Sequence, residues 1–476
     1  KHTKVLLFLH VCKKSSIFVR NFEFMRYFWS ILLLFTAVLV GCDKESAPET
    51  SSEARVNTFT FYKDTLNLGL IETTYKIDHS GDTGRIYCTD SLRFGTRLDS
   101  VVPYVTYKAT PGSATFYLPD TTIVSTGVDT MNFNQSPIYL HVISSDLSNE
   151  QWYKFSIYVH QADPELYTWE RLTEKIFEPQ NCETKAFLTK NGFALFVNNG
   201  LGTTLYQSKE GKTWTQTASQ IPSLPVPCYV REIVQHNDTL YYIDNGSSYY
   251  STDLLNWTKK DYSSSSTVPV TMLLSYNNHP WCVIQDSINK QLMLATIQVD
   301  SICPLTNLAG TTDGYLPATF PISEFAAVAF ESSSERPRAM VVGGRDYHGN
   351  IVNSRWNLEY APNSGYRIKD FSISQPTFES LTGVSIIQYA GHLIMFGGIN
   401  NDLSWRSNIL YSIDEGMNWF LPDTAKNQLP STYDPNRYNQ TVLVDDSLNI
   451  FMIGGQSHTQ SFSDVYRGFL NSAKWE

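Results

Sequence analysis

Three glycine pairs, each at the end of a short apolar run, constrain the fold of this chain more than any other feature. The runs end in Gly343-Gly344, Gly397-Gly398 and Gly454-Gly455, and each pair is followed about nine residues later by a small polar pair and another β-like run. Short strands and glycine turns that repeat every 40–55 residues or so are typical of β-propeller blades. The sequence therefore predicts an all-β propeller in the C-terminal part of the chain.

The glycine-pair segments resemble kelch repeats, in which glycine ends the second strand of a blade and starts the loop to the third. A second repeat covers the region without glycine pairs: a strand, a polar turn, and then Trp214, Trp257 or Trp419. Residues 412–419 match the Asp-box pattern Ser-x-Asp-x-Gly-x-x-Trp, in which the Ser and Asp side chains bond the amides of their own turn. Ser412 and Asp414 are therefore expected to be structural.

Counted together, the two repeats predict six blades within residues 167–476. The segment 167–172 is similar to the strand that follows the turn of a blade, but the strands that should precede it are missing. We expect this segment to complete the last blade, because closing the ring removes the free edges of the sheets. The expected blades lie near 183–215, 228–258, 268–300, 323–370, 384–420 and 438–470.

Residues 55–162 predict a separate domain. They contain about seven short runs rich in β-branched and aromatic residues, which are split by turn residues such as Gly81 and Gly112. Seven or so strands in about 105 residues are typical of an immunoglobulin-like sandwich. The polar residues that follow are expected to be the linker to the propeller.

The first part of the chain has the features of an export signal. Met25 is the expected start, and a basic region and an apolar run over 31–40 lead to Gly41 and Cys42. An apolar run of about ten residues fits a signal peptide and is shorter than the ~20 residues of a membrane-spanning helix. The ending Leu-Val-Gly-Cys resembles a bacterial lipobox, in which the cysteine is lipidated. We expect a signal peptide with an upstream extension at 1–41 and a lipidated tether at 42–54.

The acidic residues after Cys42 are similar to the surface-export signal of Bacteroidetes lipoproteins. The expected location is therefore the outer membrane, reached through the lipid anchor only, with the protein facing the periplasm or the cell surface. Residues 1–41 hold six Lys/Arg and one Glu, so without them the net charge moves from −10 to about −15. An acidic chain without a Lys/Arg cluster is not expected to bind nucleic acid.

The cysteines after Cys42 give no sign of a zinc site, because none of them forms a CxxC pair. Their burial as small hydrophobic residues is favoured over a disulfide, although one disulfide stays open in an oxidising compartment. No metal or cofactor is predicted. The five cysteines are Cys88, Cys182, Cys228, Cys282 and Cys303.

The order of lipobox, immunoglobulin-like domain and kelch-like propeller resembles a family of Bacteroidetes lipoproteins of unknown function, DUF6242. The segments that carry the resemblance are residues 90–96 and the propeller entry Tyr167-Thr168-Trp169. The resemblance covers nearly all of the chain after the signal and implies a galactose-oxidase-like propeller, but no established reaction.

The loops that follow the glycine pairs are the predicted ligand face, because in a blade they lie around the central channel while Asp-box turns lie on the opposite face. These loops combine aromatic rings with amide, acidic and basic groups, which suits a carbohydrate site. A solvated loop rim is the alternative, and packing of the loop tryptophan on a neighbouring blade is another. The candidate ligand-binding residues are Arg345, Asp346, His348, Asn401, Asp402, Trp405, Arg406, Gln456 and His458.

Familiar catalytic patterns are missing from the sequence. It has no Arg-Ile-Pro motif near the propeller start, as sialidases have, no cysteine in a glycine-pair loop for a copper site, and no Gly-x-Ser-x-Gly elbow. We therefore expect a non-catalytic binding module of the cell envelope, for a glycan or a protein. Two alternatives stay open: a propeller glycoside hydrolase or lyase, and a structural or assembly partner of an envelope complex.

Overall fold

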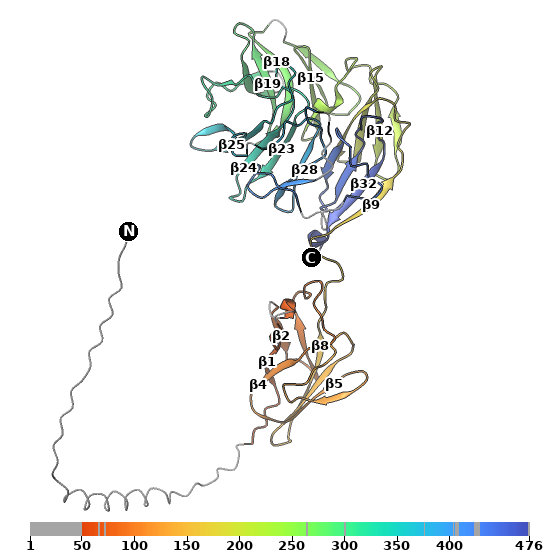
Figure 1. Ribbon diagram of the computed structural model, residues 1–476, viewed down its shortest axis with the longest axis vertical. Helices are drawn as coiled ribbons and strands as arrows, with labels where there is room; N and C mark the ends of the chain where they lie inside the picture. The colour runs from red at the N-terminus through yellow and green to blue at the C-terminus, as the bar shows by residue number, and fades with distance from the viewer. Residues whose placement is uncertain are drawn as a thin grey trace, which may run out of the picture. The chain divides into compact units, whose positions relative to one another are not determined.

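The computed structural model divides the chain into two compact units, residues up to Val159 and residues from His160, and both are built from β-strands (Figure 1). Among the residues that the structure describes, three 3-10 helices accompany the strands: η1 (Leu68–Leu70), η2 (Val230–Glu232) and η3 (Asn471–Lys474). The structure describes residues 50–474 except 65–66, 71–72, 263–264, 299–300, 376, 403, 405–408 and 423–428.

The N-terminal unit contains a six-stranded sheet in the order β2-β3-β8-β7-β5-β6 and a two-stranded sheet β1-β4. The strands are β1 (Val56–Phe61), β2 (Tyr75–Asp78), β3 (Thr83–Cys88), β4 (Pro103–Tyr107), β5 (Pro111–Tyr117), β6 (Thr122–Val124), β7 (Tyr139–Ser144) and β8 (Glu150–Ser156).

The two sheets of this unit share one aromatic core. Phe59 of β1 meets Phe155 of β8 with ring centres 5.1 Å apart, and Phe116 stacks on Phe155 from β5. β3 and β8 run parallel, whereas the other pairs are antiparallel. The division into six and two strands differs from the four-and-three arrangement of an immunoglobulin constant domain, so what the structure establishes is an N-terminal β-sheet domain.

The C-terminal unit is a β-propeller of six sheets. The first sheet contains β10 (Glu183–Thr189), β11 (Gly192–Asn198), β12 (Thr203–Ser208) and β13 (Thr215–Ala218). The second contains β14 (Val234–His236), β15 (Thr239–Asp244), β16 (Ser247–Ser251) and β17 (Thr258–Asp261). The third contains β18 (Thr267–Tyr276), β19 (His279–Asp286), β20 (Leu292–Gln298) and β21 (Ser301–Pro304), and β22 (Tyr315–Leu316) also pairs with β20.

The remaining three sheets follow in chain order. They are β23 (Ala326–Glu331), β24 (Pro337–Val342), β25 (Arg355–Ala361) and β26 (Gly365–Asp370); β27 (Ser385–Tyr389), β28 (His392–Phe396) and β29 (Leu410–Ser412); and β30 (Thr441–Val444), β31 (Ile450–Ile453), β32 (Val465–Leu470) and β9 (Tyr167–Thr173). Each blade range expected from the repeats overlaps one of these sheets, but the first three ranges end too early: β13 and β17 extend past them, and β21 and β22 lie beyond the third.

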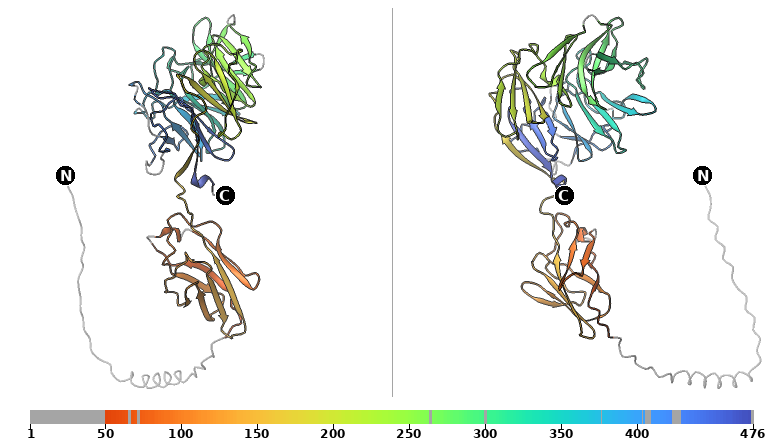
Figure 2. Two further views of the ribbon diagram at one scale, coloured as in Figure 1. Left: turned by 90° about the vertical axis from the view of Figure 1, so that its right-hand side faces the viewer. Right: turned by 180° about the vertical axis from the view of Figure 1, so that it is seen from behind.

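The last sheet is completed by the first strand of the propeller. β9 pairs antiparallel with β32, with Trp169 opposite Gly468, so the two ends of the domain lie in one sheet (Figure 2). The inner strands neighbour one another in turn, and β30 returns to β10. The predicted closing strand at 167–172 is confirmed.

All six glycines of the three pairs have positive φ, from 61° to 102°. A Cβ added at the first glycine of a pair would lie 2.3 Å from the Leu381 carbonyl oxygen for Gly343 and 2.3 Å from that of Arg437 for Gly397. At Gly454 it would meet Thr184 Oγ1 at 2.4 Å. In each case the obstructing residue belongs to the next sheet, so glycine is needed both for the left-handed backbone and for close contact between sheets.

The Asp-box turn is structural, as the sequence predicts. Asp414 accepts hydrogen bonds from Ser412 Oγ at 2.8 Å and from the Asn418 backbone N–H at 2.8 Å, while the Gly416 N–H donates to Ser412 Oγ at 2.9 Å. Trp419 is buried beneath the turn. These polar groups are committed to their own turn and are not available to a ligand.

A buried ion pair lies beside the strand that closes the ring. Arg437 donates to both Asp464 carboxylate oxygens at 2.6 and 3.1 Å, and the two side chains are 1% and 6% exposed. The guanidinium also lies 3.8 Å from the ring centre of Phe462. Arg171 of β9 approaches the same carboxylate at 3.5 Å, so Asp464 connects β9 to the last sheet.

We expect Asp464→Asn to destabilise the propeller by about 3–5 kcal/mol, because it leaves Arg437 buried without its counter-charge. The matched control is Glu170→Gln, which removes an exposed ion pair to Arg467 (2.7 Å) across the same β9–β32 pairing. That change should cost less than about 1 kcal/mol. Urea unfolding measures both, and equal losses would show that burial of the Arg437–Asp464 pair does not matter.

Candidate functional site

The innermost strands of the propeller enclose a cavity of about 370 Å³ on the central channel. Its lining comes from all six sheets, and polar groups gather where the inner strands begin. We call this end the channel mouth and define it by Glu183, Lys185, Arg231, Glu232, Glu324, Thr382, Gly383, Asn439 and Gln440.

The mouth lies at the same end of the propeller as the glycine pairs. Gly343 and Gly344 end β24, which runs antiparallel to β23, and Arg345 just after them bridges to Ser323 before β23. The Asp-box turn follows β29, the third strand of its sheet, and therefore lies at the opposite end of the strands. The predicted separation of glycine-pair loops and Asp-box turns thus holds in the fold.

Three equivalent residues, each two positions before an inner strand, have left-handed backbone. They are Glu324 before β23 (φ 54°), Gly383 before β27 (φ 68°) and Asn439 before β30 (φ 57°). Glycine takes this conformation readily and asparagine tolerates it, but glutamate rarely does. Glu335 and Glu415 share this backbone, but Glu324 alone among these glutamates lines the cavity, which supports a use for its carboxylate there.

Hydrogen bonds link these residues around the mouth from sheet to sheet. The Gly383 N–H donates to the Glu324 carbonyl at 3.3 Å, and the Asn439 N–H donates to the Gly383 carbonyl at 2.7 Å. Arg231 then donates to Asn439 Oδ1 and, at 3.0 Å, to Glu183 Oε1. From Glu324 to Glu183, this series of hydrogen bonds therefore connects residues of five of the six sheets.

Glu324 is held in place by two further donors. Arg345 Nε donates to Glu324 Oε2 at 2.8 Å, and Thr382 Oγ1 donates to the same oxygen at 2.8 Å. Burial opposes ionisation of Glu324, but the Thr382 hydrogen bond and the charges of Arg231 and Arg345 outweigh it and lower the pKa of this carboxyl. Glu324 is therefore a fixed negative charge at the mouth.

Glu232 and Lys185 have the opposite environment, because burial disfavours their charged forms. Burial raises the pKa of Glu232 to about 7, with Arg231 opposing and Glu183 and Glu324 adding to the rise. Burial, together with the charge of Arg231, lowers the pKa of Lys185 to about 8. Two carboxyls of one cavity thus differ in protonation near neutral pH, which is a mark of functional sites.

Several polar atoms of the mouth are not satisfied within the part of the chain that the structure describes. Glu183 Oε2, Arg231 Nε and both side-chain amide atoms of Gln440 are buried without a hydrogen-bond partner there. Buried polar atoms of this kind are uncommon in folded proteins and call for an explanation. A polar ligand that enters the mouth is one explanation that fits their clustering.

Among the residues predicted from sequence, Arg345 belongs to this network, through its bonds to Glu324 and to the Gly349 carbonyl at 3.0 Å. Asp346 does not face a ligand. It is buried, and its carboxylate accepts from the N–H groups of His348 (2.8 Å) and Asn350 (2.9 Å) in its own turn. Its role resembles that of the Asp-box aspartate.

The other predicted residues lie apart from the network. His348, Asn401, Asp402 and His458 are exposed on loops, and Gln456 contributes backbone bridges to Tyr438 and Ser461. Trp405 and Arg406, the residues with the strongest sequence case for stacking on a sugar, lie outside the described residues, as does Cys42.

The residues that sequence reasoning missed are Glu183, Lys185, Arg231, Glu232, Glu324, Asn439 and Gln440. Their one signal is a charged or amide residue immediately before a short apolar run, as in Glu324 before the run Phe-Ala-Ala-Val-Ala. Such a pattern also occurs at ordinary strand ends, so it becomes informative only when the fold places these strand starts around one channel.

The described residues offer little support for metal or cysteine chemistry. They contain no group of three or more His, Cys, Asp or Glu residues arranged to hold a metal ion. Cys182, Cys228 and Cys282 are buried and free, and burial raises the pKa of each thiol. In the same part of the chain, no helix has the length and apolar character to cross a membrane.

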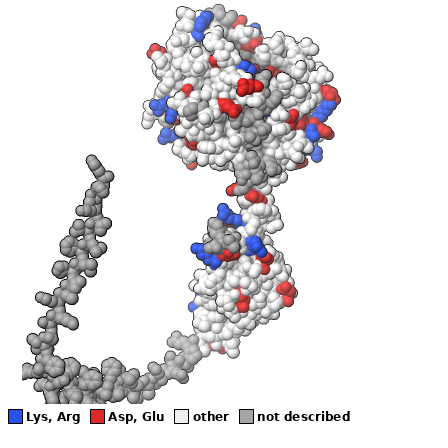
Figure 3. All heavy atoms as spheres, viewed as in Figure 1, with Lys and Arg blue, Asp and Glu red and all other residues white. Residues whose placement is uncertain are grey.

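Charge on the surface is mixed. On the side seen in Figure 3, Lys/Arg and Asp/Glu groups are scattered in small patches among uncharged residues over both units. This side therefore lacks the continuous basic stripe that nucleic-acid binding proteins present.

These features define a class of protein in which a β-propeller follows an N-terminal β-sheet domain in the sequence. Residues 163–476 match the DUF6242 beta propeller domain, and residues 49–157 match the DUF6242 N-terminal domain, a domain of unknown function. The chain belongs to the DUF6242 family. A solved structure, "Structure of YjhT", is similar to it with 12% identity and a TM-score of 0.27, over 69% of this chain and 90% of that chain. No curated protein sequence matches the chain.

The raised pKa of Glu232 gives a stability prediction. Between its ordinary value of 4.5 and about 7 the folded state holds a proton that the unfolded state has lost, so Glu232 destabilises the fold progressively as pH rises through this window. Glu232→Gln should therefore gain stability over the wild type between pH 4.5 and pH 8, by roughly 3.5 kcal/mol at about 1.4 kcal/mol per pKa unit between 4.5 and about 7.

Urea unfolding at several pH values measures this difference. Glu331→Gln, at an exposed position on β23, is the control and should follow the wild type across the range. A Glu232→Gln curve that stays parallel to the wild-type curve from pH 4.5 to 8 would contradict the buried, neutral state of Glu232.

Proposed function

We propose that this protein is a non-catalytic binding module of the cell envelope and that its ligand is a glycan held at the channel mouth. The observation that carries the proposal is the hydrogen-bonded chain from Glu324 to Glu183, with a strained glutamate and unsatisfied polar atoms around one cavity. Such a rigid set of donors and acceptors is pre-organised to bind several hydroxyl groups.

The lining of the cavity also suits a sugar. Tyr229 and Phe325 lie among the charged and amide residues, and Tyr229 is 49% exposed. Aromatic faces pack against the C–H groups of a sugar ring, while fixed carboxylate, guanidinium and amide groups bond its hydroxyls. A cavity of about 370 Å³ is within the usual size of small-ligand sites, so it suits one or two sugar residues.

The envelope location and the finer features of the fold are part of this proposal. Its support is the lipobox ending at Cys42 and the polar tether after it, which imply a lipoprotein of the outer membrane. We also propose that the six sheets are the six blades of one kelch-like ring and that the N-terminal domain is a rearranged immunoglobulin-like sandwich.

A second function has one specific observation in its favour. Glu232 has a pKa near 7 and Glu324 a lowered pKa, and both line the same cavity. A protonated and an ionised carboxyl in one site are the acid and the carboxylate of a glycoside hydrolase. Release of reducing ends from a glycan, lost in Glu232→Gln, would favour this enzyme over a binding module.

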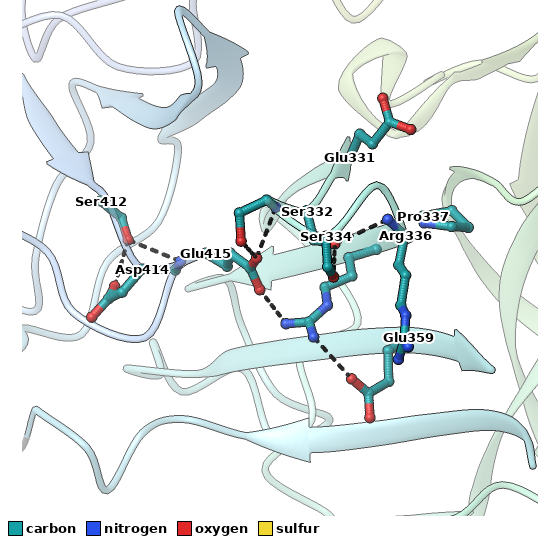
Figure 4. Close-up of polar contacts among 12 residues, drawn as sticks. Glu331, Ser332, Ser334, Arg336, Pro337, Glu359, Ser412, Asp414 and Glu415 are labelled. Atoms are coloured by element: carbon teal, nitrogen blue, oxygen red, sulfur yellow. Dashed lines mark hydrogen bonds and ion pairs between the residues drawn. The ribbon is translucent and has the colours of Figure 1, made fainter.

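We expect Arg231→Lys to weaken glycan binding at least about tenfold, because lysine keeps the charge but loses the fork that bonds Asn439 and Glu183 together. The control is Arg338→Lys at the other end of the strands. Arg338 likewise connects two carboxylates, those of Glu359 and Glu415 (both labelled in Figure 4), and its side chain is 23% exposed where that of Arg231 is 19%.

A glycan array followed by isothermal titration calorimetry measures binding for the wild type and both variants. The proposal predicts at least one glycan whose affinity falls in Arg231→Lys and is unchanged in Arg338→Lys. Equal losses in both variants would place the ligand elsewhere. Binding to no glycan, with co-purification of an envelope protein, would replace the glycan with a protein partner or an assembly role.

A further inference from the structure

Lys185 is an amine in the channel without a counter-ion. It lies on β10, half-buried in the wall of the cavity, with its Nζ 6.0 Å from the centre of the Phe187 ring. Within the described residues no hydrogen bond or ion pair reaches this amine. The other lysine of the same hairpin differs: the Lys190 side chain is 77% exposed and pairs with Asp238.

The charged groups around the channel explain why Lys185 stays unpaired. Arg231 takes Glu183 as its partner, and Arg345 takes Glu324, so two acids of the mouth are already neutralised. Glu232, the third, lines the same cavity, and burial raises its pKa to about 7, so that only part of it is charged at neutral pH. With a pKa of about 8, roughly a tenth of the Lys185 side chains are neutral at pH 7, against well under a hundredth for an ordinary lysine.

We propose that Lys185 is a reactive amine that forms a Schiff base with an aldehyde-bearing ligand in the channel. A desolvated lysine beside another cation is the usual setting for this chemistry. The open-chain form of a reducing sugar is the ligand class that fits, because the mouth supplies hydroxyl-binding groups next to the amine. The ligand class, though not the amine's reactivity, rests on the proposed glycan function.

The reaction needs no oxidant or reductant. The nitrogen lone pair of Lys185 attacks the carbonyl carbon, and a C–N bond forms as the C=O bond becomes a C–O bond. The resulting carbinolamine loses its hydroxyl as water, with both amine protons removed from nitrogen in the course of the reaction, and a C=N bond remains. Glu232, whose pKa of about 7 keeps part of it protonated near neutral pH, is the acid of the cavity that can protonate the departing hydroxyl.

The test is reductive trapping with glyceraldehyde and sodium cyanoborohydride on the purified full chain at pH 7.5, with modification of each lysine followed by mass spectrometry. We expect Lys185 to be modified at least about tenfold faster than Lys190, because far more of it is neutral. The Lys185 rate should level off above about pH 8. Both lysines are compared within one wild-type molecule, so no variant needs to fold.

Lys185→Met removes the amine and keeps much of the length of the side chain, and it should abolish the fast phase while Lys190→Met leaves that phase intact. A Lys185 rate equal to or below that of Lys190 overturns the proposal. Calorimetry with a reducing oligosaccharide and its borohydride-reduced alditol then separates the two ideas. Equal affinities overturn the Schiff base but leave glycan binding standing. Binding of neither overturns the glycan function, while fast trapping of Lys185 would still support the reactive amine.

Discussion

The pairing of β9 with β32 is the contact on which the rest of the propeller depends. It joins residues about 300 positions apart in the sequence, with Tyr167 opposite Leu470 and Trp169 opposite Gly468. Without it the last sheet would end at β32 with a free edge, and the two ends of the domain would not be joined in one sheet. Asp464 strengthens this pairing from inside the sheet, because its carboxylate lies between Arg437 and Arg171.

Closure also creates the mouth. Once the sheets are in a ring, the three glycine pairs let the last three sheets each approach the next one closely, and the residues before the inner strands converge on one opening. Glu324 and Asn439 adopt left-handed backbone there, at a cost of order 1–3 kcal/mol each, and neighbouring hydrogen bonds hold them in place. The mouth differs from the Asp-box turn in how its polar groups are bonded: Ser412 and Asp414 bond amides of their own turn, whereas the groups of the mouth bond one another across sheets.

The sequence predicts much of this architecture because the relevant signals are local. A glycine pair in the sequence predicts a left-handed turn, and the pattern Ser412-x-Asp414 predicts the hydrogen bonds of its own turn. Arg345 can be predicted as a site residue for the same reason, because it directly follows a glycine pair in the sequence. Glu183, Arg231 and Asn439 could not be found, because they meet only through contacts between sheets more than 40 residues apart. The N-terminal domain shows the same limit: its strand runs were visible, but the parallel β3–β8 pair depends on long-range pairing that no local pattern encodes.

The central claim is that closure of the ring builds a ligand site from the starts of the inner strands. A crystal structure of the full chain with a glycan that binds it tests this most directly. The account predicts electron density for the glycan at the channel mouth, within hydrogen-bonding distance of Arg231, Glu324 or Asn439. Density at the Asp-box end or on the N-terminal domain, with the mouth filled by water alone, would contradict it.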